Sequence, residues 1–153
     1  MEDGGRIWRF VREAGVLELN SAYSYLMMCK YFRDTCIVAE VDRDLVGFVV
    51  GFRPPAQPDG LFVWQVGVSP SQRGRGVGIA MLHGLLEREA NRSVRFVEAT
   101  VAPSNQPSQA LFRRLARDWN TRCEVLDGFP EHLFPQGGHE AEPTLRIGPM
   151  DRT

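Results

Sequence analysis

The order of apolar and polar residues along the chain predicts a sheet flanked by helices. Residues 35–41 and 45–53 are rich in β-branched and aromatic side chains, and Asp42-Arg43-Asp44 between them suits a tight hairpin. Residues 61–69 form a further stretch whose two faces are both largely apolar, which is typical of a central strand. We therefore expect an antiparallel pair of strands followed by a strand in the middle of the sheet.

Helical spacing of apolar residues appears in three segments. Asn20 can cap a helix in which Tyr23, Leu26, Met27 and Tyr31 follow i, i+3, i+4, i+8 spacing. Residues 77–89 and 108–119 each carry one apolar stripe that we expect to pack on the sheet. The residues expected to face inward are Ile79, Leu82, Leu85, Leu86, Leu111, Phe112, Leu115 and Trp119.

The remaining strands complete a mixed α/β arrangement. Residues 6–12 have weak strand character, and further strands are expected at 94–101, near Cys123 and at 144–148. The predicted order of elements is strand, helix, several antiparallel strands, helix, strand, helix, strand and strand, with helices on both faces of the sheet. A chain of 153 residues fits one domain, so we expect residues 1–153 to form it.

Composition and charge exclude several classes of function. The 18 basic and 19 acidic residues leave a net charge of −1, which disfavours general nucleic-acid binding. The longest nearly apolar run, residues 45–52, is far shorter than the ~20 residues of a membrane span. Glu2 and Asp3 open a terminus without a secretory pattern, and the three cysteines form no CxxC pair. We expect a cytoplasmic protein with reduced thiols and no membrane association.

The strongest chemical signal is the turn Arg73-Gly74-Arg75-Gly76-Val77-Gly78, which follows a predicted strand and opens a predicted helix. Glycines let the backbone approach a ligand closely, and the first N–H groups of a helix have no partner within the helix. Together they favour a pyrophosphate site, and the two arginines add positive charge. This interpretation explains the paired arginines, which a turn built only for tight helix packing leaves unexplained.

Two other phosphate-binding motifs fit this turn less well. A Walker loop requires Lys followed by Ser or Thr at the helix start, where this chain has Ile79-Ala80. A dinucleotide fingerprint follows the first strand of a βαβ unit, whereas several strands precede this turn and Pro70 separates it from the last of them. The dinucleotide site remains a weaker alternative.

R-x-x-G-x-G after a central strand resembles the pyrophosphate signature of the GCN5-related N-acetyltransferases (GNATs). That resemblance implies a GNAT fold, a mixed and mostly antiparallel sheet in which the strand before the signature splays from its neighbour and binds the pantetheine arm of acetyl-CoA. It also implies a pantetheine contact from Asn105, although an Asn at such a place more often caps a helix. The implied cofactor-binding residues are Gln65, Val66, Gly67, Val68, Arg73, Gly74, Arg75, Gly76, Val77, Gly78, Asn105 and Ser108.

Five longer strings carry a further resemblance, at residues 20–26, 35–40, 51–55, 62–66 and 146–149. They resemble one GNAT family, the L-2,4-diaminobutyrate acetyltransferases of ectoine biosynthesis. The resemblance implies transfer of acetyl from acetyl-CoA to the 4-amino group of this diamine by direct attack in a ternary complex, and it implies a homodimer. Alternatives are a GNAT that acetylates another small amine or a protein N-terminus, and a non-catalytic acyl-CoA sensor.

A diamine with one carboxylate requires carboxylates for its ammonium groups and donors for its acid. The string from Gly137 to Pro143 precedes the last strand and resembles the acidic HExE cluster of the ectoine enzymes, although such a string is also common in solvated loops. One His with nearby Glu lacks the second His of a zinc motif, so we expect no metal. The expected acceptor-binding residues are Glu18, Asn20, Tyr23, Trp64 and Glu140, with His139 and Glu142 beside them.

An alkylammonium with a pKa of ~10 must lose a proton before its nitrogen can attack a thioester. Glu142 or His139, directly or through water, is the expected proton acceptor, and strand N–H groups near Val66 to Val68 are expected to polarise the carbonyl. Many GNATs carry a Tyr as general acid in the helix after the Asn loop, where this chain has Phe112. The acid therefore stays unassigned, and Gln106-Pro107 is a second departure that bears on cofactor contacts.

Overall fold

The computed structural model describes residues 1–153, and the chain divides into two compact units. The first unit comprises Met1–Phe52 and Val63–Arg92, and the second comprises Arg53–Phe62 and Ser93–Thr153, so strand β3 contributes to both. The expectation of one domain over residues 1–153 stays a prediction. None of the helices combines the length and hydropathy that crossing a membrane requires.

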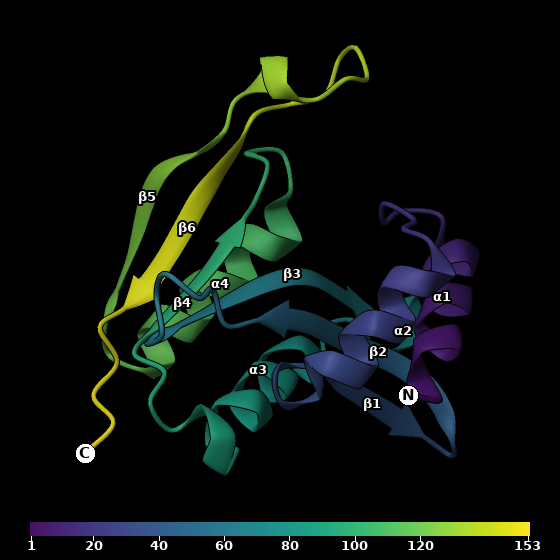
Figure 1. The fold of residues 1–153 in the computed structure, drawn as a ribbon, viewed down its shortest axis with the longest axis horizontal. Helices are drawn as coiled ribbons and strands as arrows, with labels where there is room; N and C mark the ends of the chain where they lie inside the picture. Colours follow the sequence, from purple (N-terminus) through teal and green to yellow (C-terminus); the bar gives the residue numbers. More distant parts are fainter. The chain divides into compact units, whose positions relative to one another are not determined.

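The first unit contains helices α1, α2 and α3 and strands β1 and β2 with most of β3 (Figure 1). The hairpin predicted around Asp42 is confirmed, because β1 and β2 pair antiparallel and Asp42 and Arg43 have φ angles of 50° and 72°. These positive angles are typical of a two-residue turn that matches strand twist. The elements are α1 (Asp3–Ala14), α2 (Ala22–Tyr31), β1 (Ile37–Val41), β2 (Asp44–Phe52), β3 (Gly60–Val68) and α3 (Val77–Glu87).

The expected strand at residues 6–12 is wrong, because helix α1 occupies this segment. Gly4, Ile7 and Val11 are its buried residues and repeat at i, i+3 and i+7, which places them on one helical face. Gly15 ends the helix in a left-handed conformation at φ 69°. A window of seven residues hid this period, because it contains only two of the three buried positions.

The buried face of α2 also differs from the one expected. The cap is Ser21, whose hydroxyl accepts a hydrogen bond from the Ser24 amide at 3.2 Å, and Asn20 lies one residue before it. The buried residues are Tyr25 and Met28. The four residues whose helical spacing predicted this helix are all exposed: Tyr23, Leu26, Met27 and Tyr31.

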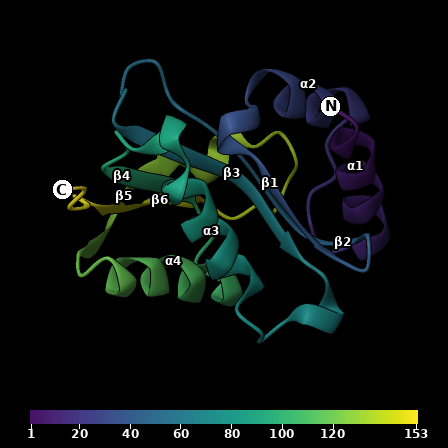
Figure 2. The ribbon, with the colours of Figure 1, turned by 90° about the horizontal axis from the view of Figure 1, so that it is seen from below.

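Helices cover both faces of the strands in the first unit (Figure 2). Adjacent residues of β2 show the alternation: a side chain at Gly47 would meet Met81 and Val77 of α3, whereas Phe48 belongs to the core under the other two helices. Successive side chains of a strand point to opposite faces, so this pair fixes which helix lies on which face. The core around Phe48 contains Ile7, Val11, Tyr25, Met28, Cys36 and Val50.

The second unit contains the first residues of β3 and the elements from β4 onward. Antiparallel β4 (Phe96–Thr100), β6 (Glu142–Gly148) and β5 (Arg122–Phe129) lie side by side, and α4 (Gln106–Asp118) packs on β5 and β6. Both C-terminal strands are longer than expected. Short 3-10 turns lie at Arg33–Thr35, Pro70–Gln72, Glu89–Asn91 and Glu131–Leu133.

The strands hydrogen-bond in the order β1-β2-β3-β4-β6-β5, which makes the six-stranded sheet mixed and mostly antiparallel, as expected. The one parallel pair is β3 with β4, and its register covers only Gly60–Phe62 opposite Phe96–Glu98. Strand β3 runs on to Val68, six residues beyond the last of these pairs. This short register is the backbone feature that a splayed strand pair requires.

Candidate active site

The glycine turn presents unpaired backbone donors at the start of α3. Gly74 and Gly76 adopt φ angles of 76° and 77°, in the left-handed region that glycine enters without steric cost. The amides of Gly74, Gly76, Val77 and Gly78 donate to no protein acceptor, whereas the intervening Arg75 amide donates to the Gln72 carbonyl at 3.4 Å. The turn therefore offers four N–H groups at the positive end of a helix dipole.

Both arginines of the turn are available to a ligand. Arg73 and Arg75 are exposed and neither forms an ion pair with the protein. No acidic residue lies in the first turn of α3, so the field there is positive. Charge and geometry at this turn fit a phosphate-bearing group.

The end of β3 places alternate backbone groups on its two edges. The Ser69 amide donates to the Val46 carbonyl of β2 at 2.7 Å. Since successive residues of a strand direct their N–H and C=O groups to opposite edges, Val68 and Val66 direct theirs away from β2. These two residues, and not Gln65 or Gly67, carry the backbone groups that a ligand on the other edge could reach.

The side chain of Gln65 joins a polar network that sequence reasoning missed. Its Nε2 atom donates to the Glu18 carbonyl at 2.8 Å, and its Oε1 atom accepts from the Tyr25 hydroxyl at 2.7 Å. The Nδ2 atom of Asn20 in turn donates to the same hydroxyl at 3.4 Å. Tyr25 is fully buried, and its ring lies 6.0 Å from that of Trp64 between centroids.

Four of the expected acceptor-binding residues therefore lie in the first unit, and three of them contact this network. Glu18, Asn20 and Trp64 are linked through Tyr25 and Gln65, and Trp64 keeps 36% of its surface exposed. Tyr23 is 71% exposed and forms no hydrogen bond or ring contact with the network. Tyr25 and Met28 are three residues apart and share one face of α2. This spacing is the sequence pattern that could have identified Tyr25 as buried.

His139 and Glu140 lie in the second unit on the connection between β5 and β6, and Glu142 is the first residue of β6. The Nε2 atom of His139 is 3.7 Å from Oε2 of Glu142, and its ring stacks on Phe134 with centroids 3.7 Å apart. Oε1 of Glu142 lies 3.5 Å from the Thr100 hydroxyl of β4, within the limit of a hydrogen bond. Packing and polar contacts thus orient both side chains, and Phe134 and Thr100 were not expected there.

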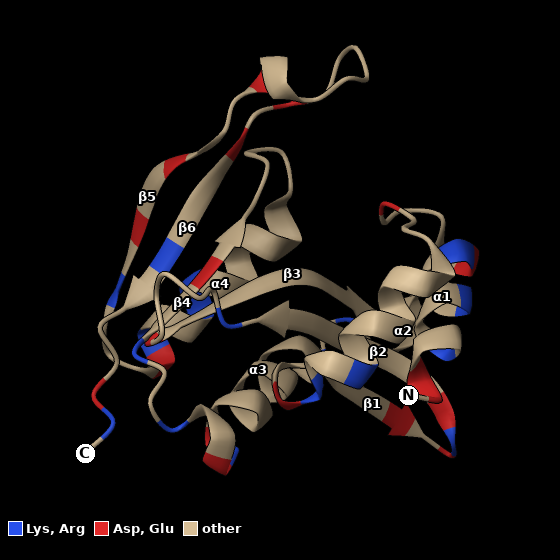
Figure 3. Ribbon diagram, viewed as in Figure 1, with Lys and Arg blue, Asp and Glu red and all other residues tan.

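Glu140 makes a different set of contacts. Its carboxylate accepts from the Ser104 hydroxyl at 2.8 Å, which ties this connection to the loop before α4. The connection carries acidic residues and neither Lys nor Arg between Pro130 and Ala141 (Figure 3). Its uncompensated negative charge favours a cationic ligand.

Asn105 caps α4, which is the more common role of an Asn at such a place. Its side-chain oxygen accepts from the Ser108 amide at 3.2 Å, which satisfies one of the free donors of the first helical turn. Asn105 and Ser108 lie in the second unit, whereas the other expected cofactor-binding residues lie in the first unit. Phe112 of the same helix is only 2% exposed, so this position belongs to the core.

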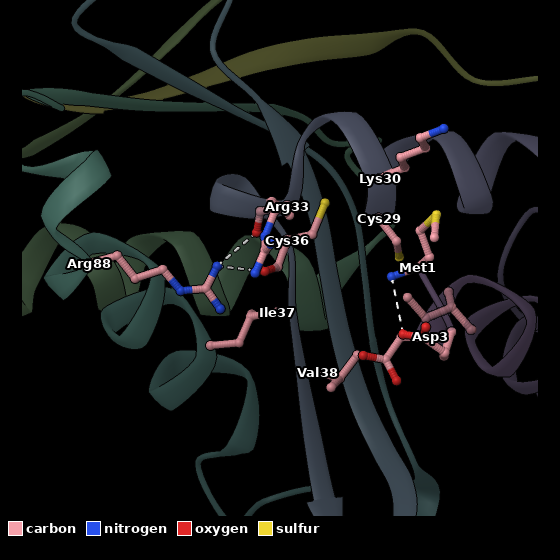
Figure 4. Close-up of a pocket in the computed structure, with 11 residues that line it drawn as sticks. Met1, Asp3, Cys29, Lys30, Arg33, Cys36, Ile37, Val38 and Arg88 are labelled. Carbon is pink, nitrogen blue, oxygen red and sulfur yellow. Dashed lines mark hydrogen bonds and ion pairs between the residues drawn. The ribbon is translucent and has the colours of Figure 1, made fainter.

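A separate cavity of about 660 Å³ lies in the first unit among α1, α2 and β1 (Figure 4). None of the expected site residues lines it. Arg88 at its edge donates to the carbonyls of Arg33, Asp34 and Cys36, so its guanidinium is already occupied by protein acceptors. No cluster of three His, Cys, Asp or Glu side chains that could hold a metal ion occurs in the structure, and the expectation of no metal stays a prediction.

Comparison with known proteins identifies the family. Residues 6–116 match the model of the acetyltransferase (GNAT) family. The chain is 53% identical over 150 residues to L-2,4-diaminobutyric acid acetyltransferase of Shouchella clausii strain KSM-K16, covering 98% of this chain and 84% of the relative. The enzyme of the same name from Nocardia farcinica is 43% identical over 148 residues, covering 97% of this chain and 76% of the relative.

Solved structures agree with these sequence relationships. The diaminobutyrate acetyltransferase of Paenibacillus lautus, in complex with its substrate L-2,4-diaminobutyric acid and coenzyme A, matches with a TM-score of 0.92 at 46% identity, covering 97% of this chain and 90% of that one. Ard1 from Thermoplasma volcanium shares the fold at 18% identity, with a TM-score of 0.72, covering 98% of this chain and 93% of that one. The fold and the resemblance inferred from sequence are confirmed, and this chain belongs to the GNAT acetyltransferases and, among them, to the L-2,4-diaminobutyric acid acetyltransferases.

Proposed function

We propose that this protein transfers the acetyl group of acetyl-CoA to the 4-amino group of L-2,4-diaminobutyrate, a step of ectoine biosynthesis. The observation that carries the proposal is the agreement over 97% of the chain with an enzyme solved with that diamine and coenzyme A. The product is N4-acetyl-L-2,4-diaminobutyrate, and the second product is free coenzyme A.

The diphosphate of acetyl-CoA binds to the glycine turn. The unpaired amides of Gly74, Gly76, Val77 and Gly78 donate to its oxygens, and Arg73 and Arg75 neutralise its charge. The backbone of Val66 and Val68 pairs with the pantetheine arm, because these residues direct their polar groups away from β2. Asn105 and Ser108 contribute a further pantetheine contact in addition to the helix cap that they form.

The diamine is held through its charge. The carboxylate of Glu18 and the amide of Asn20 bind its polar groups, with Tyr23 beside them, and the exposed face of Trp64 packs against an ammonium group. A cation over an indole ring contributes ~0.5–2 kcal/mol, depending on how far it is desolvated. In the second unit, Glu140 adds negative charge to the connection that carries His139 and leads into Glu142.

Proton removal from the 4-ammonium group falls to the His139 and Glu142 pair. The Nδ1 atom of His139 lies 2.6 Å from the Glu140 carbonyl, which can only accept, so Nδ1 carries a proton. In the neutral ring, Nε2 then presents a lone pair, and it lies 3.7 Å from a carboxylate oxygen of Glu142. Two acceptors at this separation suit an ammonium donor, and either of them can take its proton.

The freed amine attacks the thioester carbonyl carbon in a ternary complex. The strand N–H near Val66 and Val68 stabilises the oxyanion of the tetrahedral intermediate. The attacking nitrogen carries a positive charge after the attack and loses its second proton to solvent, and collapse of the intermediate then breaks the carbon–sulfur bond and releases a thiolate. Since a thiol of pKa ~8.5 is a tolerable leaving group near neutrality, solvent can supply its proton afterwards.

Incubation with acetyl-CoA and L-2,4-diaminobutyrate tests the activity. Thiol release and mass spectrometry of the product report transfer, and fragmentation locates the acetyl group. Ornithine and a peptide with a free N-terminus are the comparison acceptors, because the same family fold serves amines of other kinds. Transfer to ornithine or the peptide in preference to diaminobutyrate, or coenzyme A binding without turnover on any amine, overturns the proposal.

We also propose that the protein forms a homodimer and that it lies in a reducing compartment, the cytoplasm. Exposed apolar side chains on and after β5, among them Val125 at 58% and Leu133 at 58%, support association through a surface of the second unit. Cys29, Cys36 and Cys123 are all unpaired, which is typical of proteins in the cytoplasm. Sedimentation velocity over a concentration series tests the dimer, and fractionation of cells tests the location.

A further inference from the structure

Tyr25 occupies the centre of a buried polar network in the first unit. Its hydroxyl donates to Gln65 at 2.7 Å and accepts from Asn20 at 3.4 Å, so both roles of the group are used by protein atoms. Its ring is fully buried and packs edge-on against Phe48 of β2, at 6.5 Å between centroids. Hydrogen bonds at the hydroxyl and packing around the ring therefore hold the Tyr25 side chain in one orientation.

The network reaches the segment between α1 and α2, which has no regular secondary structure. Gln65 of β3 donates to the carbonyl of Glu18 at 2.8 Å, and Asn20 is attached directly to the Tyr25 hydroxyl. Two points of the segment are therefore fixed to one strand and one helix. Without these bonds, a short exposed segment would sample many conformations, since each residue loses conformational entropy on ordering.

Tyr25 also lies against Trp64, the next residue before Gln65 on the strand. The two ring centroids are 6.0 Å apart and the planes are inclined by 30°, so the Tyr25 ring backs the indole. Trp64 is one-third exposed, and the orientation of its exposed ring face depends on the side chains that pack against its other face.

We infer that Tyr25 is a positioning residue for the amine substrate: through Gln65 and its own ring, it sets the orientation of Glu18, Asn20 and Trp64. This inference rests on the proposed function, because those three residues are the proposed diamine contacts. The glycine turn takes no part in the network, so we expect binding of the acetyl-CoA diphosphate not to depend on Tyr25.

Tyr25→Phe tests the inference, because it keeps the ring and deletes only the hydroxyl. We expect KM for diaminobutyrate to rise by about 3- to 10-fold, the value of one or two neutral hydrogen bonds, with KM for acetyl-CoA within about twofold of the original. Gln65→Met, which keeps the length of the side chain, has the same effect. The double variant should lose less than the sum of the two single losses, because both substitutions break the Tyr25–Gln65 bond, while each also breaks one bond of its own.

Tyr31→Phe is the matched control, because Tyr31 lies on the same helix, is 65% exposed and forms no hydrogen bond through its hydroxyl. It should leave both KM values unchanged. A merely structural role for Tyr25 would lower kcat and both affinities together, or only the melting temperature, and either outcome overturns the inference. Failure of the proposed function is distinguishable, because it shows as absence of diaminobutyrate acetylation in the unsubstituted protein.

Discussion

The Nε2 atom of His139 lies 3.7 Å from Oε2 of Glu142, while Nδ1 of the same ring lies 2.6 Å from the Glu140 carbonyl. The carbonyl fixes the proton on Nδ1, and the stacked ring of Phe134 fixes the plane of the imidazole. The pair is therefore oriented before any substrate arrives. Preorganised acceptors of this kind lose little free energy to reorganisation when a proton is transferred.

Glu142→Gln keeps the size of the side chain and removes its charge. We expect kcat/KM for diaminobutyrate to fall by about 100-fold or more, since a positioned base contributes ~10²- to 10⁴-fold, while KM for acetyl-CoA stays within about twofold. Steady-state kinetics with each substrate varied in turn measures both values. Glu131→Gln changes an exposed residue of the connection that leads into Glu142, and this control should retain full activity. Unchanged turnover in Glu142→Gln would transfer the base role to another group.

Gly76→Ala places a Cβ on a residue with φ of 77° at the N-cap of α3. The left-handed conformation costs an alanine ~1 kcal/mol or more, so the turn will relax and misdirect the amides that hold the diphosphate. We expect KM for acetyl-CoA to rise by about tenfold or more and KM for diaminobutyrate to change little.

Gly15→Ala separates strain from cofactor binding. Gly15 has φ of 69° and open space around its Cβ position, as Gly76 nearly has, but it ends α1 and touches no proposed ligand. It should lower the melting temperature to a similar degree and leave both KM values intact. Equal loss of acetyl-CoA affinity in the two variants would mean that general destabilisation, and not the turn, is being measured.

Phe112→Tyr tests whether a tyrosine at this position can act as the general acid that the chain lacks. Phe112 is 2% exposed, so an added hydroxyl would be buried and would need a new acceptor within a packed core. We expect a destabilisation of ~1–3 kcal/mol in urea unfolding and no gain in kcat. An increase in kcat, with a pH profile that gains an acidic group, would show that the position faces the departing thiolate.

The sequence predicted most elements because their periods are long or their ends are marked. Residues 77–89 bury all four of the residues expected, and the Asp42-Arg43 turn marks the hairpin on both sides. The strand predicted at residues 6–12 was wrong because this window of about two helical turns contains only two of the three buried residues of α1, too few to show the helical period. The α2 face failed because α2 is apolar on every side, so its period cannot distinguish the buried face from the exposed one.

The glycine turn could be read from sequence, because its chemistry is backbone chemistry and needs only glycines at a helix start. The network around Tyr25 could not, since Tyr25 and Gln65 are 40 residues apart and meet only through the fold. The assignment of Gln65 to the cofactor concerned its backbone and stays a prediction, and the sequence could not show that its side chain donates to the Glu18 carbonyl. Contacts between distant side chains have no local sequence pattern.

Cys36 makes the stability of the first unit depend on pH above neutrality. Burial raises the pKa of this thiol from 9.0 to about 11. The unfolded chain therefore ionises Cys36 at a lower pH than the folded chain, which keeps the proton, and the stabilisation present below pH 9 is lost as pH rises toward 11. We expect the free energy of unfolding to fall by up to ~2–3 kcal/mol over this window from Cys36 alone.

Urea unfolding at pH 8, 9 and 10 measures the decline, and Cys36→Ala provides the reference. That variant starts less stable because it leaves a small cavity, but its decline with pH should be shallower by the contribution of one thiol. Parallel slopes in the two proteins would show that Cys36 ionises equally readily in the folded and unfolded chain.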